Sequence, residues 1–424
     1  MIENTSSGKK KFPKNIFYGW WIILAGLVGM TLGVGFNFHA LNAFIIPISD
    51  TFNVSIAVVA TVLSVARIET ALIGPLEGYL VDRFGPRTMM FIGIPIMSLG
   101  FFLISFASNI TIFIICFLLG VVLGSSLGLG NPISTSVANW WVKKRGRAFG
   151  ILWLGTSLAS MIVPLVNMFI ESFGWRNAFR LMGFLVLIVG IPIACVMRHR
   201  PEQYGMLPDG DTSNDTLSKE DNSSIKNEVS FTMMQAIRLK TFWAFAFSVS
   251  IRIGITTAVA INSFPLVVSL GGTATQASML FLLQGVLSAP GRLFLSWAGD
   301  NINKRYIMAS SLLVMTISLF FMSQADSFTF LVFCWIPYAV VWGGLSSLPQ
   351  SLRADLFGRK NFGSIQGAMS PLHSIFSVAG PIFAAAIYDS TQSYSRAFIT
   401  FSGLALISMI LILIAKPVNN ELNS

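Results

Sequence analysis

The chain has 424 residues, of which 54% are hydrophobic and only 11% are charged. Because soluble domains carry about 25% charged residues, this composition excludes an ordinary soluble protein and predicts an integral membrane protein. The formal net charge of +10 does not indicate a nucleic-acid partner, since the basic residues lie in short segments between apolar runs and not on one soluble face.

The first apolar run, from about residue 19 to 47, is too long for a cleavable signal peptide and is predicted to be the first membrane span. Further apolar segments of spanning length follow it. The twelve predicted spans cover residues 19–48, 54–81, 88–107, 109–138, 147–170, 177–197, 242–268, 274–299, 306–323, 327–352, 362–388 and 396–415. The tails 1–18 and 416–424 are predicted to be short and cytoplasmic.

Lysine and arginine collect in alternate connections, beginning with the N-terminal tail and including residues 143–147 and 353–360. Cytoplasmic loops of membrane proteins carry such an excess. Both termini are therefore predicted to lie in the cytoplasm, which agrees with an even number of spans, and the protein is expected to be a multi-pass protein of the cytoplasmic (plasma) membrane.

Hydropathy collapses between residues 198 and 241, where Ser, Asn and Asp accumulate without a helical or strand period. This segment is predicted to be a disordered cytoplasmic linker between a first half (19–197) and a second half (242–415). The halves repeat, because Asp82 and Arg87 recur as Asp300 and Arg305 at the same offset. The predicted fold is an all-α membrane protein with 12 transmembrane helices in two pseudo-symmetric six-helix halves, and we expect a monomer.

Residues 78–87 (GYLVDRFGPR), after the second span, resemble the signature loop of the major facilitator superfamily, and a degenerate copy ends at Arg305 after the eighth span. The motifs at 18–20 (YGW), at 200–210 (RPEQYGMLPDG) and at 291–292 (GR) are similar to those of the oxalate:formate antiporter and bacterial monocarboxylate transporter group. This resemblance implies the major facilitator fold and transport by alternating access between the two halves.

Well inside the predicted spans, arginine exceeds acidic residues, since Arg67, Arg252 and Arg292 accompany Glu69. A charged side chain at the bilayer centre costs about 3 kcal/mol or more, so it usually faces a cavity, a partner or a substrate. Guanidinium groups bind carboxylates bidentately where water competes poorly. The excess of arginine therefore favours an anionic substrate.

In span 274–299, small or polar residues follow one helical face at Gly285, Ser288, Arg292, Ser296 and Gly299. We interpret this stripe as a lining of the transport route, with Arg292 as the principal substrate-binding residue and Ser288 beside it. The alternative is that Arg292 pairs with another helix or with backbone carbonyls.

Further candidates lie on other spans. Arg252 and His373 occupy comparable polar stripes and are candidates for substrate binding, although Arg252 has Glu69 as an alternative counter-ion. Arg67, on a face with small and polar neighbours, is also a substrate-binding candidate. Glu69 and His373 are the candidates for carrying a coupled proton, because burial of a carboxyl group raises its pKa.

The loop residues Asp82, Arg83 and Arg87, and their counterparts Asp300 and Arg305, are predicted to form a gate. An acidic side chain at a helix end accepts hydrogen bonds from the N-terminus of a neighbouring helix in one conformation and loses them in another. The family resemblance implies a cytoplasmic latch at this place, whereas the alternative is simple topogenic charge.

The resemblance also bears on the substrate. Oxalate-handling members of the group carry a lysine where the motifs align His373, which implies a preference here for a monocarboxylate. Proton-coupled members carry an aspartate one turn before the arginine, where this chain has Ser288. Proton symport, exchange and facilitated transport therefore stay open.

The sequence thus predicts a secondary active or facilitative transporter of a small organic monocarboxylate, with a proton or an exchanged anion as possible second substrate. The lipid bilayer is the only other partner, and no catalytic, cofactor or metal site is expected. The alternatives are an oxalate/formate-type or dicarboxylate exchanger and a non-transporting receptor of the same fold. A drug–proton antiporter is disfavoured, because residues 150–164 lack the glycine-proline pattern of that class.

Overall fold

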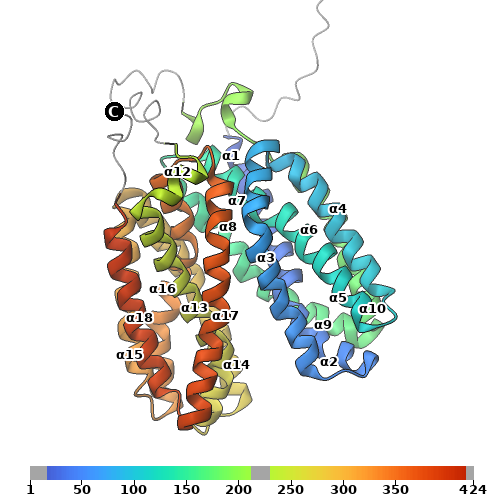
Figure 1. Ribbon diagram of the computed structural model, residues 1–424, viewed down its shortest axis with the longest axis vertical. Coiled ribbons are helices and arrows are strands. Elements are labelled where there is room, and N and C mark those ends of the chain that lie inside the picture. Colours follow the sequence, from blue (N-terminus) through green and yellow to red (C-terminus); the bar gives the residue numbers. More distant parts are fainter. Residues whose placement is uncertain (1–16, 212–229, 417–424) are drawn as a thin grey trace, which may run out of the picture.

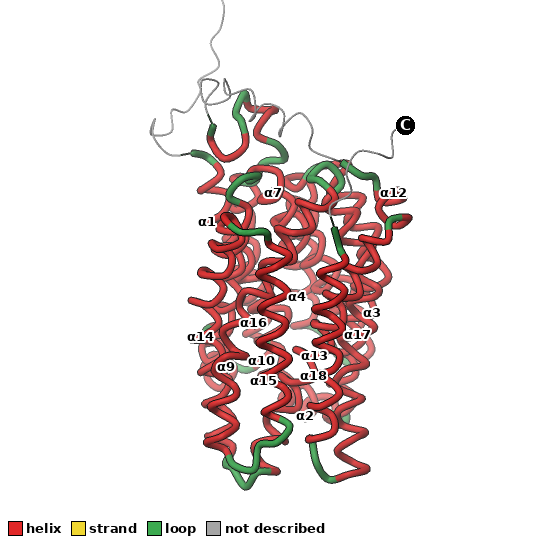
Figure 2. Tube along the Cα trace, turned by 90° about the vertical axis from the view of Figure 1, so that its left-hand side faces the viewer, coloured by secondary structure: helices red, strands yellow, loops and turns green. Residues whose placement is uncertain are grey.

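The computed structural model describes residues 17–211 and 230–416, and every regular element in these ranges is a helix. The side chains of residues 42, 56–57, 60–70, 160 and 274 lie outside the description. The helices run side by side in two bundles, coloured blue to green and yellow to red (Figure 1). The same parallel arrangement is visible in the view turned by 90° (Figure 2).

The first half contains six spans, three of which are interrupted. Short π-helical turns break the first and fourth spans, and Met161 separates the two parts of the fifth. The elements are α1 (Gly19–Val34), η1 (Gly35–His39), α2 (Leu41–Phe52), α3 (Ile56–Phe84), α4 (Pro86–Ser105), α5 (Ile110–Cys116), η2 (Phe117–Val122), α6 (Leu123–Ser125), η3 (Ser126–Gly130), α7 (Asn131–Trp140), α8 (Arg145–Ser160), α9 (Ile162–Phe173) and α10 (Trp175–Val196).

The second half has six continuous spans preceded by one short helix. They are α12 (Met233–Arg238), α13 (Lys240–Ser269), α14 (Ala274–Asn301), α15 (Lys304–Met322), α16 (Phe328–Phe357), α17 (Phe362–Thr391) and α18 (Ser395–Ile414). The sequence marks their ends: Thr273 and Gln276 form a capping box at α14, and Gly358 ends α16 with a φ of 80°.

Eleven of the described helical segments are long and apolar enough to cross a membrane. The twelfth predicted span corresponds to α3, a helix of 29 residues whose side chains are only partly described. Within each half the described ends of the first and last spans lie together, because Tyr18 donates a hydrogen bond to the Val196 carbonyl and Thr241 donates one to the Lys416 carbonyl. The prediction of an all-helical, twelve-span fold is confirmed.

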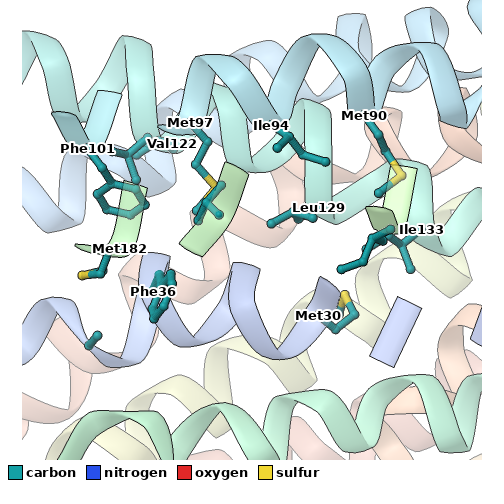
Figure 3. Close-up of a cluster of buried hydrophobic side chains, with 14 of the residues drawn as sticks. Met30, Phe36, Met90, Ile94, Met97, Phe101, Val122, Leu129, Ile133 and Met182 are labelled. Atoms are coloured by element: carbon teal, nitrogen blue, oxygen red, sulfur yellow. The ribbon is translucent and has the colours of Figure 1, made fainter. Parts of the chain in front are cut away.

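Each half has its own apolar core. In the first half, methionine, isoleucine and phenylalanine side chains from α1, α4, α7 and α10 fill the space between these helices (Figure 3). The glycines of the fourth span let helices approach closely, since a Cβ at Gly120 would meet the backbone of Gly100 in α4. Close helix packing explains this glycine run.

The halves meet at the linker end of the molecule and diverge towards the other end, where α2 and α9 lie well apart from α14 (Figure 1). The closest contacts between halves join α3 to α17 and α8 to α14. At Gly78 of α3, a Cβ would meet the carbonyl oxygen of Gly363 in α17. This conformation is therefore closed on the linker side.

The first part of the predicted linker, residues 198–211, is folded, in contrast to the predicted disorder. Residues 198–211 contain two short 3₁₀ helices, η4 (Pro201–Tyr204) and η5 (Pro208–Gly210), that pack on the first half. The Asp209 carboxylate accepts hydrogen bonds from the backbone amides of residues 142–144 at 2.8–3.0 Å. Arg198 stacks on the Tyr18 and Tyr204 rings, 3.8 and 4.2 Å from their centroids. Composition did not predict this folded segment, because capping hydrogen bonds and cation–π contacts hold it in place and an apolar core does not.

His199, which follows Arg198 outside the membrane spans, provides a pH-dependent prediction. Burial, together with the neighbouring Arg200 charge, lowers the pKa of His199 to about 4. Below its usual pKa of about 6.5 the unfolded chain binds a proton that the folded protein does not, so this residue reduces stability as the pH falls from about 6.5 to 4. We expect the melting temperature of His199→Gln to fall less than that of the wild type between pH 7.5 and pH 5. Parallel curves would contradict the assignment.

Candidate functional site

Arg292 lies on α14 at the boundary between the two halves and is completely buried. Its Nη1 donates to the Trp153 carbonyl at 2.6 Å and to the Ser157 hydroxyl at 2.9 Å, both on α8 of the first half. Its Nε donates to the Ser346 hydroxyl of α16 at 3.1 Å. In this conformation, therefore, the guanidinium ties the second half to the first through neutral acceptors.

The charge of Arg292 is not neutralised by any carboxylate among the described residues. Its Nη2 is buried and has no hydrogen-bond partner among the described residues. The Trp342 ring lies 5.8 Å from the guanidinium carbon. A guanidinium that keeps a free N–H and has an aromatic wall, yet lacks a counter-ion, is suited to a small anion.

The predicted stripe on α14 faces other helices. Ser288 donates to the Gly285 carbonyl of its own helix at 3.1 Å and packs against Gly343 of α16. Ser296 lies 2.7 Å from the Ser347 hydroxyl. The stripe thus allows close approach of α14 to α16 and α8, with Arg292 projecting between them.

A second group of polar side chains lies within the second half. Arg252 on α13 lies within electrostatic reach of Tyr338 on α16 and of His373 on α17. Arg353, at the linker end of α16, is also within reach of His373. The structure thus brings together the predicted residues Arg252 and His373, and it adds two groups that the sequence analysis did not single out for binding.

The side chains of Arg67 and Glu69 lie outside the described residues, so their predicted roles stay predictions. Two buried charges on the first half's side of the interface escaped the sequence analysis. Glu77 on α3 is 1% exposed and Arg145, the first residue of α8, is 3% exposed. The sequence did contain a signal that could have identified Glu77, because this acidic residue lies beside Gly78 within a predicted span.

Asp82 closes the linker side of the interface between α3 and α17. Its carboxylate accepts hydrogen bonds from the backbone amides of Gly363 and Ser364 at 3.0 and 2.7 Å, and from the Ser364 hydroxyl at 2.6 Å. These amides form the first turn of α17, where the free N–H groups and the helix dipole favour a negative charge. The predicted cap of a neighbouring helix N-terminus is present.

Asp300 makes the equivalent contact between α14 and α8. It accepts hydrogen bonds from the amides of Gly146 and Arg147 at 2.6 and 3.0 Å, and the Arg147 side chain lies 3.4 Å away. The internal repeat therefore places two carboxylates at pseudo-symmetric positions, each capping a helix of the opposite half.

The other predicted gate residues do not join the halves. Arg83 donates to the Tyr79 hydroxyl on its own helix, and Arg87 stacks on Phe91 of α4. Arg305 donates to the Leu413 carbonyl within the second half.

A third ionic contact between the halves was not predicted. Asp355 on α16 lies 2.9 Å from Arg145 of α8 and 2.6 Å from Lys304 of its own half. Arg359 contacts Glu202 of the linker and the Asn139 carbonyl of the first half. Asp82, Asp300 and Asp355 together hold the linker side closed.

Comparison with known proteins places the chain among transporters. A family model described as Major Facilitator Superfamily matches residues 27–261 and 244–424. Monocarboxylate transporter 12 of Mus musculus is 23% identical over 419 residues, covering 93% of this chain and 85% of the relative. The oxalate:formate antiporter of Oxalobacter formigenes is 24% identical over 410 residues, covering 94% of this chain and 93% of the relative.

Solved structures share the fold at lower identity. The human organic anion transporter MFSD10 superposes with a TM-score of 0.72 at 14% identity, over 95% of this chain and all of that one. The proton:xylose symporter XylE gives a TM-score of 0.74 at 15% identity, over 94% and 95% of the two chains.

Proposed function

The chain belongs to the Major Facilitator Superfamily, and on that premise we propose that it is a secondary carrier of a small organic monocarboxylate. The observation that carries the proposal is the buried Arg292, a positive charge at the interface of the halves whose hydrogen-bond acceptors are all neutral. The curated relatives, named as monocarboxylate transporters and an oxalate:formate antiporter, support an anionic substrate.

Alternating access explains why Arg292 bonds across the interface. When the linker side opens, α8 moves away from α14, and the Trp153 carbonyl and the Ser157 hydroxyl leave the guanidinium. A carboxylate then replaces them, because two parallel N–H donors fit its oxygens. The same movement breaks the caps at Asp82 and Asp300, so the linker-side latch and the release of Arg292 are parts of one transition.

The orientation of the protein in the membrane follows from the distribution of its basic residues. The linker face carries the basic segments 143–147 and 353–360, and the positive-inside rule places such a face in the cytoplasm. The conformation described here is then closed to the cytoplasm, and both chain ends lie on that side.

A ligand panel on the purified protein tests the substrate class. A ligand that binds only the folded state stabilises it by about 2.7 kcal/mol at a hundred times its Kd. We expect formate, acetate, lactate or pyruvate to raise the melting temperature, and sugars, amino acids and organic cations to leave it unchanged. Stabilisation by oxalate alone would indicate a dicarboxylate exchanger, and a response only to cations would overturn the proposal.

A further inference from the structure

Three arginines on α13, α14 and α16 of the second half are buried. Arg252 and Arg292 lie in stretches of the spans without acidic residues, whereas Arg353 lies two residues before Asp355 at the linker end of α16. Arg252, Arg292 and Arg353 lie on α13, α14 and α16 and are 8%, 0% and 2% exposed. The stretches 242–298, 306–322, 328–352 and 362–388 contain no Asp or Glu. Removing such charges from water is costly unless partners compensate. The hydrogen-bond partners of each arginine therefore show which of the three charges is left uncompensated.

Two of the three arginines are held by hydrogen bonds. Arg292 bonds to α8 and α16, as described above. Arg353 donates from Nη1 to the Gln366 side chain, whose Nε2 donates to Asn131 of α7 at 2.6 Å. The Arg353 guanidinium carbon also lies 5.1 Å from the Phe362 ring centroid. Both side chains thus reach across to the first half, directly or through one residue.

Arg252 differs from the other two. Its guanidinium makes no hydrogen bond or ion pair with the rest of the described chain, and its Nε is buried without a partner. Two further polar atoms near it share this condition, namely the Tyr338 hydroxyl and Nε2 of His373. Since buried polar groups in proteins are nearly always hydrogen-bonded, these three groups on three helices have unused hydrogen-bonding capacity that a bound ligand would satisfy.

Two of the three helices, α13 and α17, are in close contact beside these groups. A Cβ at Gly254, two residues after Arg252, would lie 2.8 Å from the Phe376 carbonyl oxygen of α17, so α13 and α17 touch near His373. Tyr338 is fully buried, with its ring 5.5 Å from that of Trp335 on the same helix. The arrangement supplies a charged donor, a hydroxyl donor and an imidazole nitrogen, with a net positive charge.

We propose that Arg252, Tyr338 and His373 form a carboxylate-binding subsite, separate from Arg292, that takes the substrate in the conformation closed on the linker side. The inference rests on the proposed carboxylate carrier. In this conformation α8 and α16 occupy most donors of Arg292, whereas those of Arg252 and Tyr338 are unused. The carboxylate accepts from the Arg252 guanidinium and the Tyr338 hydroxyl, and it passes to Arg292 when α8 withdraws.

Binding to single-residue variants tests this subsite. Kd values are measured for sodium acetate, pyruvate and lactate, against sodium chloride at equal ionic strength, on the wild type, Arg252→Gln, Tyr338→Phe and Ser250→Ala. Ser250 is a buried hydroxyl on α13 that donates to the Ala246 carbonyl of its own helix at 2.7 Å, and it serves as the matched control. A lost hydrogen bond to a charged group corresponds to roughly a 10- to 150-fold change in affinity.

We expect Arg252→Gln and Tyr338→Phe to weaken binding within that range and Ser250→Ala to change it less than twofold. Because Arg252 is an uncompensated charge, Arg252→Gln should melt at or above the wild-type temperature without ligand. Unchanged Kd values in both variants overturn the subsite, as does a marked loss of ligand-free stability in Arg252→Gln. If Arg252→Gln does not fold, Tyr338→Phe decides alone. Absence of carboxylate binding to the wild type would instead refute the proposed function.

Discussion

Replacing Arg292 with lysine should reduce the initial rate of carboxylate uptake into proteoliposomes at least about 100-fold, equivalent to about 2.7 kcal/mol. Lysine keeps the charge, but its ammonium group cannot donate in the planar arrangement that meets Trp153, Ser157 and Ser346 together. Arg292→Gln, which removes the charge, should be equally inactive.

The matched control is Arg180→Lys. Arg180 lies on α10 and contacts neighbouring residues of the first half, namely the Ser105 hydroxyl, the Asn177 side chain and the Phe106 ring. Its variant should transport at the wild-type rate. If Arg292→Lys, with a normal size-exclusion profile, keeps more than a tenth of the wild-type rate, Arg292 is not the anion anchor.

Gly78→Val should shift the protein away from the conformation closed on the linker side. A side chain at this position meets the backbone of Gly363, so α3 and α17 must separate, and Asp82 then loses its amide partners. Overpacking of this kind costs roughly 1–3 kcal/mol, which changes a two-state equilibrium by about 5- to 150-fold.

Spin labels at the exposed positions Phe84, the last residue of α3, and Lys360, two residues before α17, report this opening. We expect a longer inter-label distance in Gly78→Val together with slower uptake. Gly403→Val on α18 is the control, because a Cβ there meets nothing within 4 Å. An unchanged distance distribution would show that the contact between α3 and α17 does not control the conformation.

The sequence predicted the parts of the molecule that local patterns encode. Apolar runs predicted the spans, and the repeat of Asp82 as Asp300 predicted two equivalent positions. The polar stripe on α14 identified Arg292 as unusual. The spans and the stripe are signals within about thirty residues that reflect bilayer thickness and helix periodicity, and the repeat is recognised because each copy is itself a short local motif.

Contacts between distant segments were not predictable in the same way. The acceptors of Arg292 lie 135 and 139 residues away in sequence, and no periodicity relates α8 to α14. Arg353 was assigned to a loop because the predicted tenth span ended at residue 352, whereas α16 continues to Phe357. The folded residues 198–211 were not predicted, because hydropathy does not register carboxylate caps such as that of Asp209.

Counterflow in proteoliposomes tests the central claim most directly, since it requires only a carrier that binds the same acid on both sides. Vesicles loaded with an unlabelled monocarboxylate that stabilises the purified protein receive a trace of the labelled acid outside. We predict transient accumulation of label with the wild type and none with Arg292→Gln. Stabilisation by the acid without any accumulation would contradict the carrier and indicate a receptor of the same fold.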